Sequence, residues 1–305
     1  MILKIGIFIL SIAAFLVIVR FFSYFFIFGR PDSPFVKLVG RKLKNFIEYE
    51  KTGTVSIDKS LTVIYLKRTY NKYTEANKPG DETYLLLKKL SGEPEEIIFQ
   101  GNLGHEIKKV IVDKENHLLF YTLQDGRKEP RSCYLNIFDL NDMRNINKIK
   151  ISDKEGCIYK LFFDEINRKI FFKMILTNLP PLSYDIVSGS LKEISNDEFE
   201  KISNSLNVPE SSFIHFSKNG EKKLFFIKPF SDFLPANYKP KYNGVYINNG
   251  SSNIRISKST NSVYSSSDAI WIEDGEKVIY GAYLFDTSGK STEIKICDGI
   301  VLAAY

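Results

Sequence analysis

The stretch FSKNGEKKLFF, from Phe216 to Phe226, places an Asn-Gly turn between an aromatic residue and a short apolar run. Asn-Gly between hydrophobic runs is a strong signal for a β-hairpin. The same order of apolar residues, an Asp, Ser or Glu, a polar turn and an apolar strand occurs five times. The copies are VSIDKSLTVIYLK (55–67), VIVDKENHLLFYT (110–122), LFFDEINRKIFFK (161–173), IHFSKNGEKKLFFIK (214–228) and IWIEDGEKVIYGA (270–282).

The acidic or hydroxyl residue of each copy marks a near-regular period. With Asp58, Asp113, Asp164, Ser217 and Glu273 as markers, the intervals are 55, 51, 53 and 56 residues. A fixed period of this kind indicates a repeat architecture. Two further strand-like runs fit after each copy, for example CYLNIFDL and INKIKIS after the second one. Four antiparallel strands in a unit of about fifty residues predict the blade of a β-propeller.

The predicted fold is therefore all-β, a propeller of four-stranded antiparallel blades over residues 53–305. Five blades follow from the five copies, and six are the alternative if segment 31–52 or the tail GIVLAAY (299–305) adds a sheet. The tail is apolar to its end, so we expect it to be buried as a closing strand. A short helix is expected at 195–206, because Ser195 and Glu198 form a capping-box pattern.

The motifs FSKNGEKKLFFI and WIEDGEKVIYG resemble the WD-like repeats of Tol-B-type propellers, whose signature is roughly aromatic-Ser-Pro-Asp-Gly followed by an apolar strand. The third strands YLNIFDL and YLLLKKL are similar to the third strand of that family. The resemblance covers residues 53 to about 298, although every copy lacks the Pro and only Gly220 and Gly275 supply the Gly. It implies the propeller fold and an extracytoplasmic interaction module, but no active-site residues.

The N-terminal segment from Ile5 to Gly29 is apolar apart from Arg20. A span of this length is able to cross a bilayer as a helix, so we expect a transmembrane anchor within residues 1–30. A cleavable signal peptide is the competing interpretation, but the apolar run continues past Arg20 without a small-residue cleavage site. Residues 31–52 are expected to form a linker or juxtamembrane segment with a short basic amphipathic stretch up to Ile47.

The side of the membrane is left open by two conflicting signals. Five basic residues follow the span within fifteen positions, whereas only Lys4 precedes it: Arg30, Lys37, Arg41, Lys42 and Lys44. The positive-inside rule therefore favours a cytoplasmic domain. The family resemblance favours an extracytoplasmic one, and we expect the latter.

Charge and cysteine content exclude some classes of function. Without the first thirty residues, 39 basic residues stand against 36 acidic ones, which is too balanced for a nucleic-acid partner. Cys133, Cys157 and Cys297 are widely spaced and show no metal-binding pattern, so we expect small buried thiols.

No familiar catalytic motif is present, including GxSxG, HExxH, GxGxxG and the P-loop. We expect His105, His117 and His215 to be structural, and the markers Asp58, Asp113 and Asp164 to make side-chain-to-backbone turn bonds. No catalytic residue, metal ligand or cofactor is predicted. A propeller hydrolase or lyase acting on carbohydrates or lactones is the alternative function. Its carboxylates would come from four loop acids: Asp81, Glu82, Asp125 and Asp232.

The connections between the second and third strands of the units are predicted to share one face of the ring. They are 67–82, 124–132, 177–181, 229–244 and 286–291, and two of them are long. Tyr, Phe and Arg together are typical of recognition surfaces. The predicted binding residues are Arg68, Tyr70, Tyr73, Arg127, Arg131, Phe233, Tyr238 and Tyr242, with Phe230 nearby.

These features predict a membrane-tethered propeller that binds a protein or a cell-envelope polymer through its long-loop face. A sensor or scaffold without a small ligand is a third possibility.

Overall fold

The computed structural model describes residues 46–69, 82–102, 104–125, 132–152, 158–174, 179–206, 215–217, 219–227, 244–258 and 269–305. Within these ranges the chain is all-β apart from helix α2 (Asn196–Ser205) and the short 3-10 turn η1 (Glu273–Gly275). The strands form five groups of four antiparallel strands, which we call sheets 1 to 5.

Sheets 1 to 3 are formed, in spatial order, by these strands. Sheet 1 contains β23 (Ile300–Ala304), β3 (Thr62–Thr69), β4 (Glu82–Lys89) and β5 (Glu96–Asn102). Sheet 2 contains β6 (His105–Asp113), β7 (Leu118–Asp125), β8 (Ser132–Asp139) and β9 (Arg144–Ser152). Sheet 3 contains β10 (Ile158–Asp164), β11 (Lys169–Met174), β12 (Leu182–Asp185) and β13 (Ser190–Glu193).

The other two sheets have the same plan. Sheet 4 contains β14 (His215–Phe216), β15 (Lys223–Ile227), β16 (Gly244–Asn248) and β17 (Asn253–Ser257), and sheet 5 contains β18 (Ile270–Ile272), β19 (Lys277–Tyr280), β20 (Tyr283–Asp286) and β22 (Ile294–Lys295). Two parallel pairs are added at the edges: β1 (Phe46–Ile47) joins β17, and β2 (Gly53–Thr54) joins β21 (Ser291–Thr292).

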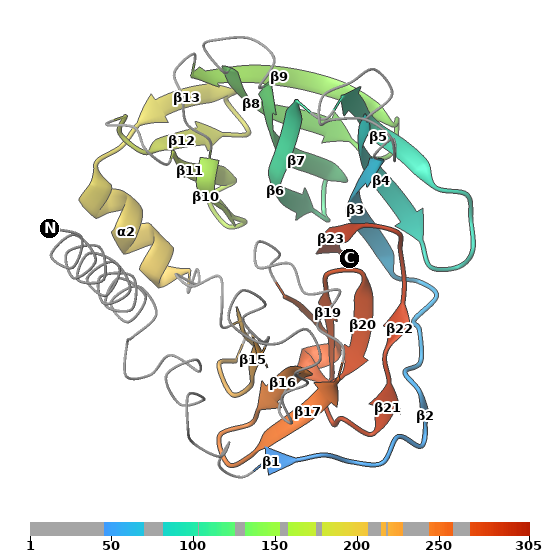
Figure 1. Cartoon of the computed structure of the whole chain (residues 1–305). Helices are drawn as coiled ribbons and strands as arrows, with labels where there is room; N and C mark the ends of the chain where they lie inside the picture. The colour runs from blue at the N-terminus through green and yellow to red at the C-terminus, as the bar shows by residue number, and fades with distance from the viewer. Residues whose placement is uncertain are drawn as a thin grey trace, which may run out of the picture.

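Successive sheets pack face to face around a ring, as Figure 1 shows. Strand β3 explains why the strands are apolar without alternation. Its Ile64 and Leu66 pack against sheet 2, whereas Val63 and Tyr65 pack against sheet 5. Strands buried on both faces need apolar side chains at every position. Further apolar clusters join sheet 2 to sheet 3 and sheet 4 to sheet 5, which makes the arrangement a β-propeller.

The last strand of the chain closes the ring beside the first long one. β23 pairs antiparallel with β3, and Val301 lies opposite Tyr65. The backbone N–H groups of Thr62 and Tyr305 also donate to each other's carbonyls, at 2.8 and 2.9 Å. The prediction of a buried closing strand is confirmed. Residues 55–57 are therefore not the first strand of their unit, because β23 occupies that place in sheet 1.

The repeated turns between first and second strands have a common chemistry. In sheet 2 the Asp113 carboxylate accepts from Asn116 Nδ2 at 3.1 Å, and in sheet 3 the Asp164 carboxylate accepts from Asn167 Nδ2 at 2.8 Å. The last turn residue, His117 or Arg168, has a positive φ of 53° or 55°. The predicted role of the marker acids as turn-bonding residues is confirmed.

Helix α2 covers the free face of sheet 3, at the end of the chain of sheets that starts with sheet 1 (Figure 1). Ser195 is its N-cap, and its Oγ accepts the backbone N–H of Glu198 at 3.1 Å, as the capping-box pattern predicts. Phe199 is fully buried and packs on the stacked rings of Phe162 and Phe171. The helix thus supplies the apolar surface that a neighbouring sheet supplies elsewhere.

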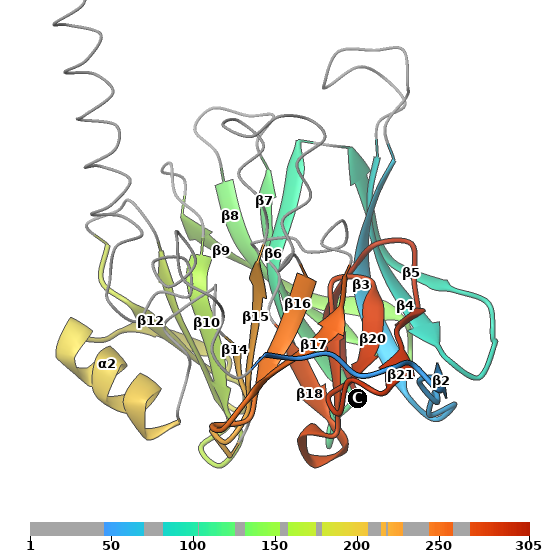
Figure 2. The ribbon, with the colours of Figure 1, turned by 60° about the horizontal axis from the view of Figure 1, so that its bottom comes forward.

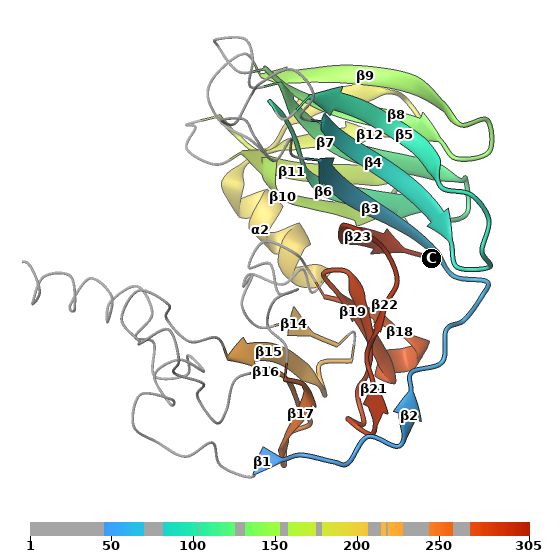
Figure 3. The same cartoon turned by 45° about the vertical axis from the view of Figure 1, so that its right-hand side comes forward.

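A strap of residues 46–55 runs along the outside of sheets 4 and 5 (Figure 3). Lys51 Nζ donates to the carbonyls of Ile256 and Ser291, at 2.8 and 2.9 Å. Glu48 forms ion pairs with Arg255 and with Lys258. Phe46 and Ile47 are a strand here rather than the end of the expected amphipathic helix, because the open edge of β17 pairs with their backbone.

The predicted anchor, residues 1–30, lies outside the described residues. Within the described ranges, no helix has the length and apolar character needed to span a bilayer. Cys133 and Cys297 are buried free thiols, as predicted, and Cys157 lies outside the described ranges.

Candidate functional site

The predicted binding residues leave the sheets at one end of the ring. Arg68 is exposed near the end of β3, opposite Thr83 of β4. The other predicted residues lie outside the described ranges: Tyr70, Tyr73, Arg127, Arg131, Phe230, Phe233, Tyr238 and Tyr242. The strand bounds nevertheless place their segments, 70–81, 126–131 and 228–243, between second and third strands of sheets 1, 2 and 4.

One of the five predicted connections is wrong. Segment 286–291 follows the third strand of sheet 5 and so begins at the opposite end of that sheet. The second and third strands, β19 and β20, are instead joined by Gly281 and Ala282, with Gly281 at a φ of 61°. The reason is the shortness of both strands, which contain four residues each.

Two of the four carboxylates that an enzyme would require are described. Glu82 accepts hydrogen bonds from the Tyr84 hydroxyl and, at 3.1 Å, from Gln100 Nε2, and these residues belong to the outer strands β4 and β5. Asp125 Oδ2 lies 3.8 Å from His105 Nε2, and His105 is buried at the start of β6. Asp81 and Asp232 lie outside the described ranges. Glu82 therefore gives the enzyme alternative no support at the axis.

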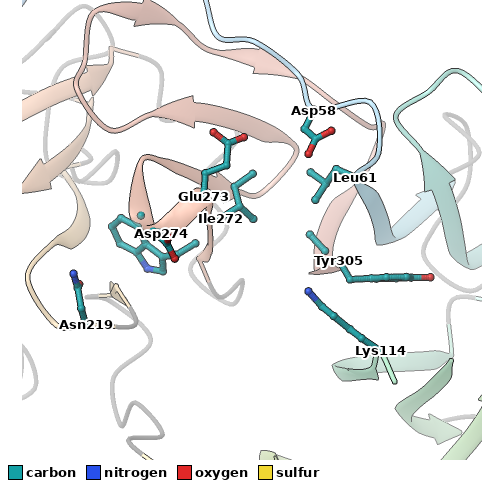
Figure 4. A pocket seen from close by; sticks show the side chains of 11 residues that line it. Asp58, Leu61, Lys114, Asn219, Ile272, Glu273, Asp274 and Tyr305 are labelled. Carbon is teal, nitrogen blue, oxygen red and sulfur yellow. The ribbon is translucent and has the colours of Figure 1, made fainter. Parts of the chain in front are cut away.

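A cavity of about 640 Å³ lies at the other end of the ring, where first-to-second-strand turns of several sheets meet. We call it the axial pocket (Figure 4). In Figure 2 these turns, such as the one after β18, lie at the lower end. The pocket is lined by Asp58, Leu61, Lys114, Asn219, Trp271, Ile272, Glu273, Asp274, Gly275, Ala304 and Tyr305.

The η1 turn after β18 contributes most of the acidic wall. Glu273 and Asp274 have φ values of 49° and 50°, in the left-handed region that disfavours side chains. Lys222 of the neighbouring sheet holds the turn by donating from Nζ to the Gly275 carbonyl at 2.8 Å and to Thr287 Oγ1 at 3.1 Å. The position of the acids is thus fixed from outside the turn.

The charges of the pocket are partly compensated. Glu273 forms an ion pair with Lys277 at 2.8 Å. Asp58 accepts from the hydroxyl and the backbone N–H of Ser60, and these hydrogen bonds lower the pKa of its carboxyl. Within the described ranges, neither Asp58 nor Asp274 has a cation within ion-pair distance. The ammonium group of Lys114 lies on the wall beside Tyr305, away from Asp274 (Figure 4).

Trp271 is the one tryptophan of the chain and a half-buried part of the pocket wall. Its indole packs against the apolar cluster between sheets 4 and 5. The buried Nε1–H has no acceptor among the described residues. Across those same ranges, no three or more His, Cys, Asp and Glu side chains are grouped to hold a metal ion.

Sequence reasoning treated the acids of this pocket as turn residues and did not bring them together. Asp58 and Glu273 are markers of the first and last copies of the repeat, 215 positions apart in the chain. The available signal was the pair of motifs SKNGEK and WIEDGEK, which contain Asn219, Trp271 and Asp274.

No protein-family model matches the chain, and no curated protein matches it significantly. Similar solved structures include TolB from Acinetobacter baumannii, with 15% identity over 73% of this chain and 51% of that chain and a TM-score of 0.33. They also include the β-propeller domain of the trilobed protease from Pyrococcus furiosus, with 13% identity, coverage of 78% and 66%, and a TM-score of 0.31. An uncharacterized protein from Listeria monocytogenes has 12% identity, coverage of 87% and 69%, and a TM-score of 0.32.

Proposed function

We propose that the chain is a membrane-tethered, five-bladed propeller that binds a protein or a cell-envelope polymer through its long-loop face. The observation that carries this proposal is the strand order of the described sheets. Segments 70–81, 126–131 and 228–243 all connect second to third strands, so they leave the same end of the ring. These segments contain the tyrosines, phenylalanines and arginines that recognition surfaces favour.

The tether is supported by the way in which the N-terminal segment joins the domain. Strand β1 pairs with β17 at the outer edge of sheet 4, and the Glu48–Arg255 ion pair holds the next residue of the strap. A preceding anchor at residues 1–30 is thereby connected to the rim of the ring rather than to its axis. We place the propeller on the extracytoplasmic side, although the basic residues after the apolar span favour the other orientation.

Site-specific photo-cross-linking in intact cells tests the binding face. A photoreactive residue at Tyr238 or Arg127 is expected to give discrete cross-linked species. The matched control is the same residue at Ile166, which is 90% exposed in a turn at the opposite end of the ring. Cross-links at Ile166 and none at the loop positions would contradict the proposed face.

Sidedness is tested separately with a cysteine at position 238 and a membrane-impermeant maleimide. Labelling of intact cells is expected for an extracytoplasmic propeller. Labelling only after lysis would place the domain in the cytoplasm.

A further inference from the structure

We propose that the axial pocket binds the basic side chain of a peptide, a lysine ammonium or an arginine guanidinium group, against Trp271 and Asp274. The pocket lies at the end of the ring opposite the long-loop face, so this site is independent of the proposed function. Its volume of about 640 Å³ is within the range of pockets that enclose small organic groups.

Charge is the first reason for a cationic ligand. Three carboxylates line the pocket, and only Glu273 has an ion-pair partner among the described residues. Asp274 and Asp58 therefore retain their negative charge toward the cavity. An opposite charge within about 4 Å of a carboxylate at a partly exposed site is attracted by a few kcal/mol before desolvation is counted. Lys114 is the competing cation of the pocket and lies on another wall (Figure 4).

Trp271 is the second, independent reason. An aromatic ring beside carboxylates attracts cations through its electron-rich face, and tryptophan is the strongest of the aromatic side chains in this respect. The ring is fixed on one side by the cluster between sheets 4 and 5, and Gly275 approaches it closely: a Cβ on Gly275 would lie 4.0 Å from Trp271 Cε3.

The buried indole N–H of Trp271 adds a preference for the kind of cation. It has no acceptor within the described part of the chain. Buried donors are normally satisfied by the protein, by water or by a bound molecule. A peptide offers carbonyl acceptors next to its basic side chain, whereas a bare metal ion or a simple amine does not.

The turn that presents Asp274 is already held in the geometry that binding requires. The Glu276 N–H donates to the Glu273 carbonyl at 3.0 Å, and Thr287 Oγ1 donates to the Gly275 carbonyl at 3.0 Å. Together with the Lys222 contact, these bonds maintain consecutive left-handed residues that would be unfavourable in isolation. A preorganised carboxylate loses little conformational freedom when a cation binds.

The test uses the full chain in detergent and the intrinsic fluorescence of Trp271, which reports from the pocket alone because the chain contains no other tryptophan. The probes are arginine amide and its uncharged isostere, citrulline amide. Arginine amide is expected to change the emission of Trp271 saturably and to bind about tenfold more tightly than citrulline amide, since the uncharged analogue forms neither an ion pair nor a cation–π contact.

Two variants change the charge of the pocket in opposite directions. Asp274→Asn is expected to weaken arginine amide about fivefold, because it removes the carboxylate, and asparagine tolerates the left-handed conformation of this position. Lys114→Met is expected to tighten binding about threefold, because it removes a competing ammonium group. Asp142→Asn, in an exposed turn at the outer edge of sheet 2, is the matched control and is expected to leave the affinity unchanged.

Three results would overturn the proposal. The first is equal binding of arginine amide and citrulline amide, and the second is no saturable response to either probe. The third is weaker binding after Lys114→Met, which would indicate an anionic ligand. Because Lys114 is exposed and makes no hydrogen bond in the described ranges, this variant keeps the test decisive even if Asp274→Asn fails to fold.

Discussion

Arg168, in the turn between β10 and β11, forms an ion pair with Asp113, in the turn between β6 and β7. The pair joins sheet 2 to sheet 3 at the end of the ring where the axial pocket lies. Asp113 is 3% exposed, and Asn116 also donates to its carboxylate. Burial by itself would raise the pKa of Asp113, but the guanidinium group of Arg168 and the amide of Asn116 outweigh it and hold the pKa below its ordinary value.

Asp113→Asn is therefore expected to lower the free energy of unfolding at pH 7 by about 2 kcal/mol, the size of a hydrogen-bonded charged contact. Because the pKa of Asp113 is depressed in the folded state, its contribution is present above the unfolded pKa of about 4 and is lost as the pH falls through the folded pKa. Urea unfolding at pH 7 and at pH 3 should show a smaller difference between wild type and variant at pH 3. A difference that stays constant with pH would show that the charge of Asp113 is not responsible.

The matched control for that measurement is Asp142→Asn. Asp142 forms an ion pair with Arg144 at 3.0 Å, but both side chains are more than half exposed. Solvent screening makes such pairs worth at most about 1 kcal/mol. The stability of this variant should stay close to that of the wild type at both pH values.

Gly299→Ala is expected to destabilise the closure of the ring. A Cβ at Gly299 would lie 2.2 Å from the Leu66 carbonyl oxygen, just before β23 pairs with β3. Backbone atoms cannot move aside without breaking this pairing, so we expect a loss of about 1–3 kcal/mol in thermal or urea unfolding. Gly53→Ala is the control, because a Cβ there meets nothing within 4 Å. Equal effects of the two substitutions would contradict the role of β23 in closure.

Cys297 is expected to resist alkylation in the folded protein. Burial raises the pKa of its thiol to about 11, and only the thiolate reacts. Iodoacetamide at pH 8 followed by peptide mass spectrometry should leave Cys297 and the buried Cys133 unmodified until denaturant is added. A cysteine introduced at the exposed Ile166 should react rapidly and serves as the positive control. Rapid native labelling of Cys297 would mean that the sheet 5 to sheet 1 interface opens.

Ser195→Ala is expected to destabilise the protein by about 1 kcal/mol, because the Glu198 N–H loses its cap. Phe199→Ala should cost more, about 3–5 kcal/mol, since this ring is fully buried against Phe162 and Phe171. Ser195→Thr retains the hydroxyl and should restore most of the loss. If the two alanine variants were equally mild, helix α2 would not be part of the packed core.

Much of the fold could be predicted from the sequence because the hairpin signals are local. An Asp or Ser followed by a polar turn determines each first-to-second-strand hairpin within about ten residues, as Asp164 and Asn167 illustrate. The all-β prediction with four-stranded antiparallel sheets is confirmed, and so are the closing strand and the buried thiols Cys133 and Cys297. The predicted binding residues other than Arg68 remain a prediction.

The errors arose where two segments compete for one position. Residues 55–57 have the pattern of a first strand, but β23 pairs with β3 in their place, and only Val55 enters the core between sheets 5 and 1. Segment 286–291 was assigned to the wrong end of sheet 5 because the Gly281–Ala282 turn is too short to be recognised from pattern alone.

The sequence by itself determined the repeat, the turn chemistry and the helix cap, since each of these depends on residues within a few positions of one another. The tertiary structure alone decided that Arg168 reaches Asp113 and that Asp58, Lys114 and Trp271 line one pocket. Residues of different repeats meet at the axis only when the sheets pack into a ring and β23 closes it. Their proximity is a property of that closure, and no local pattern contains it.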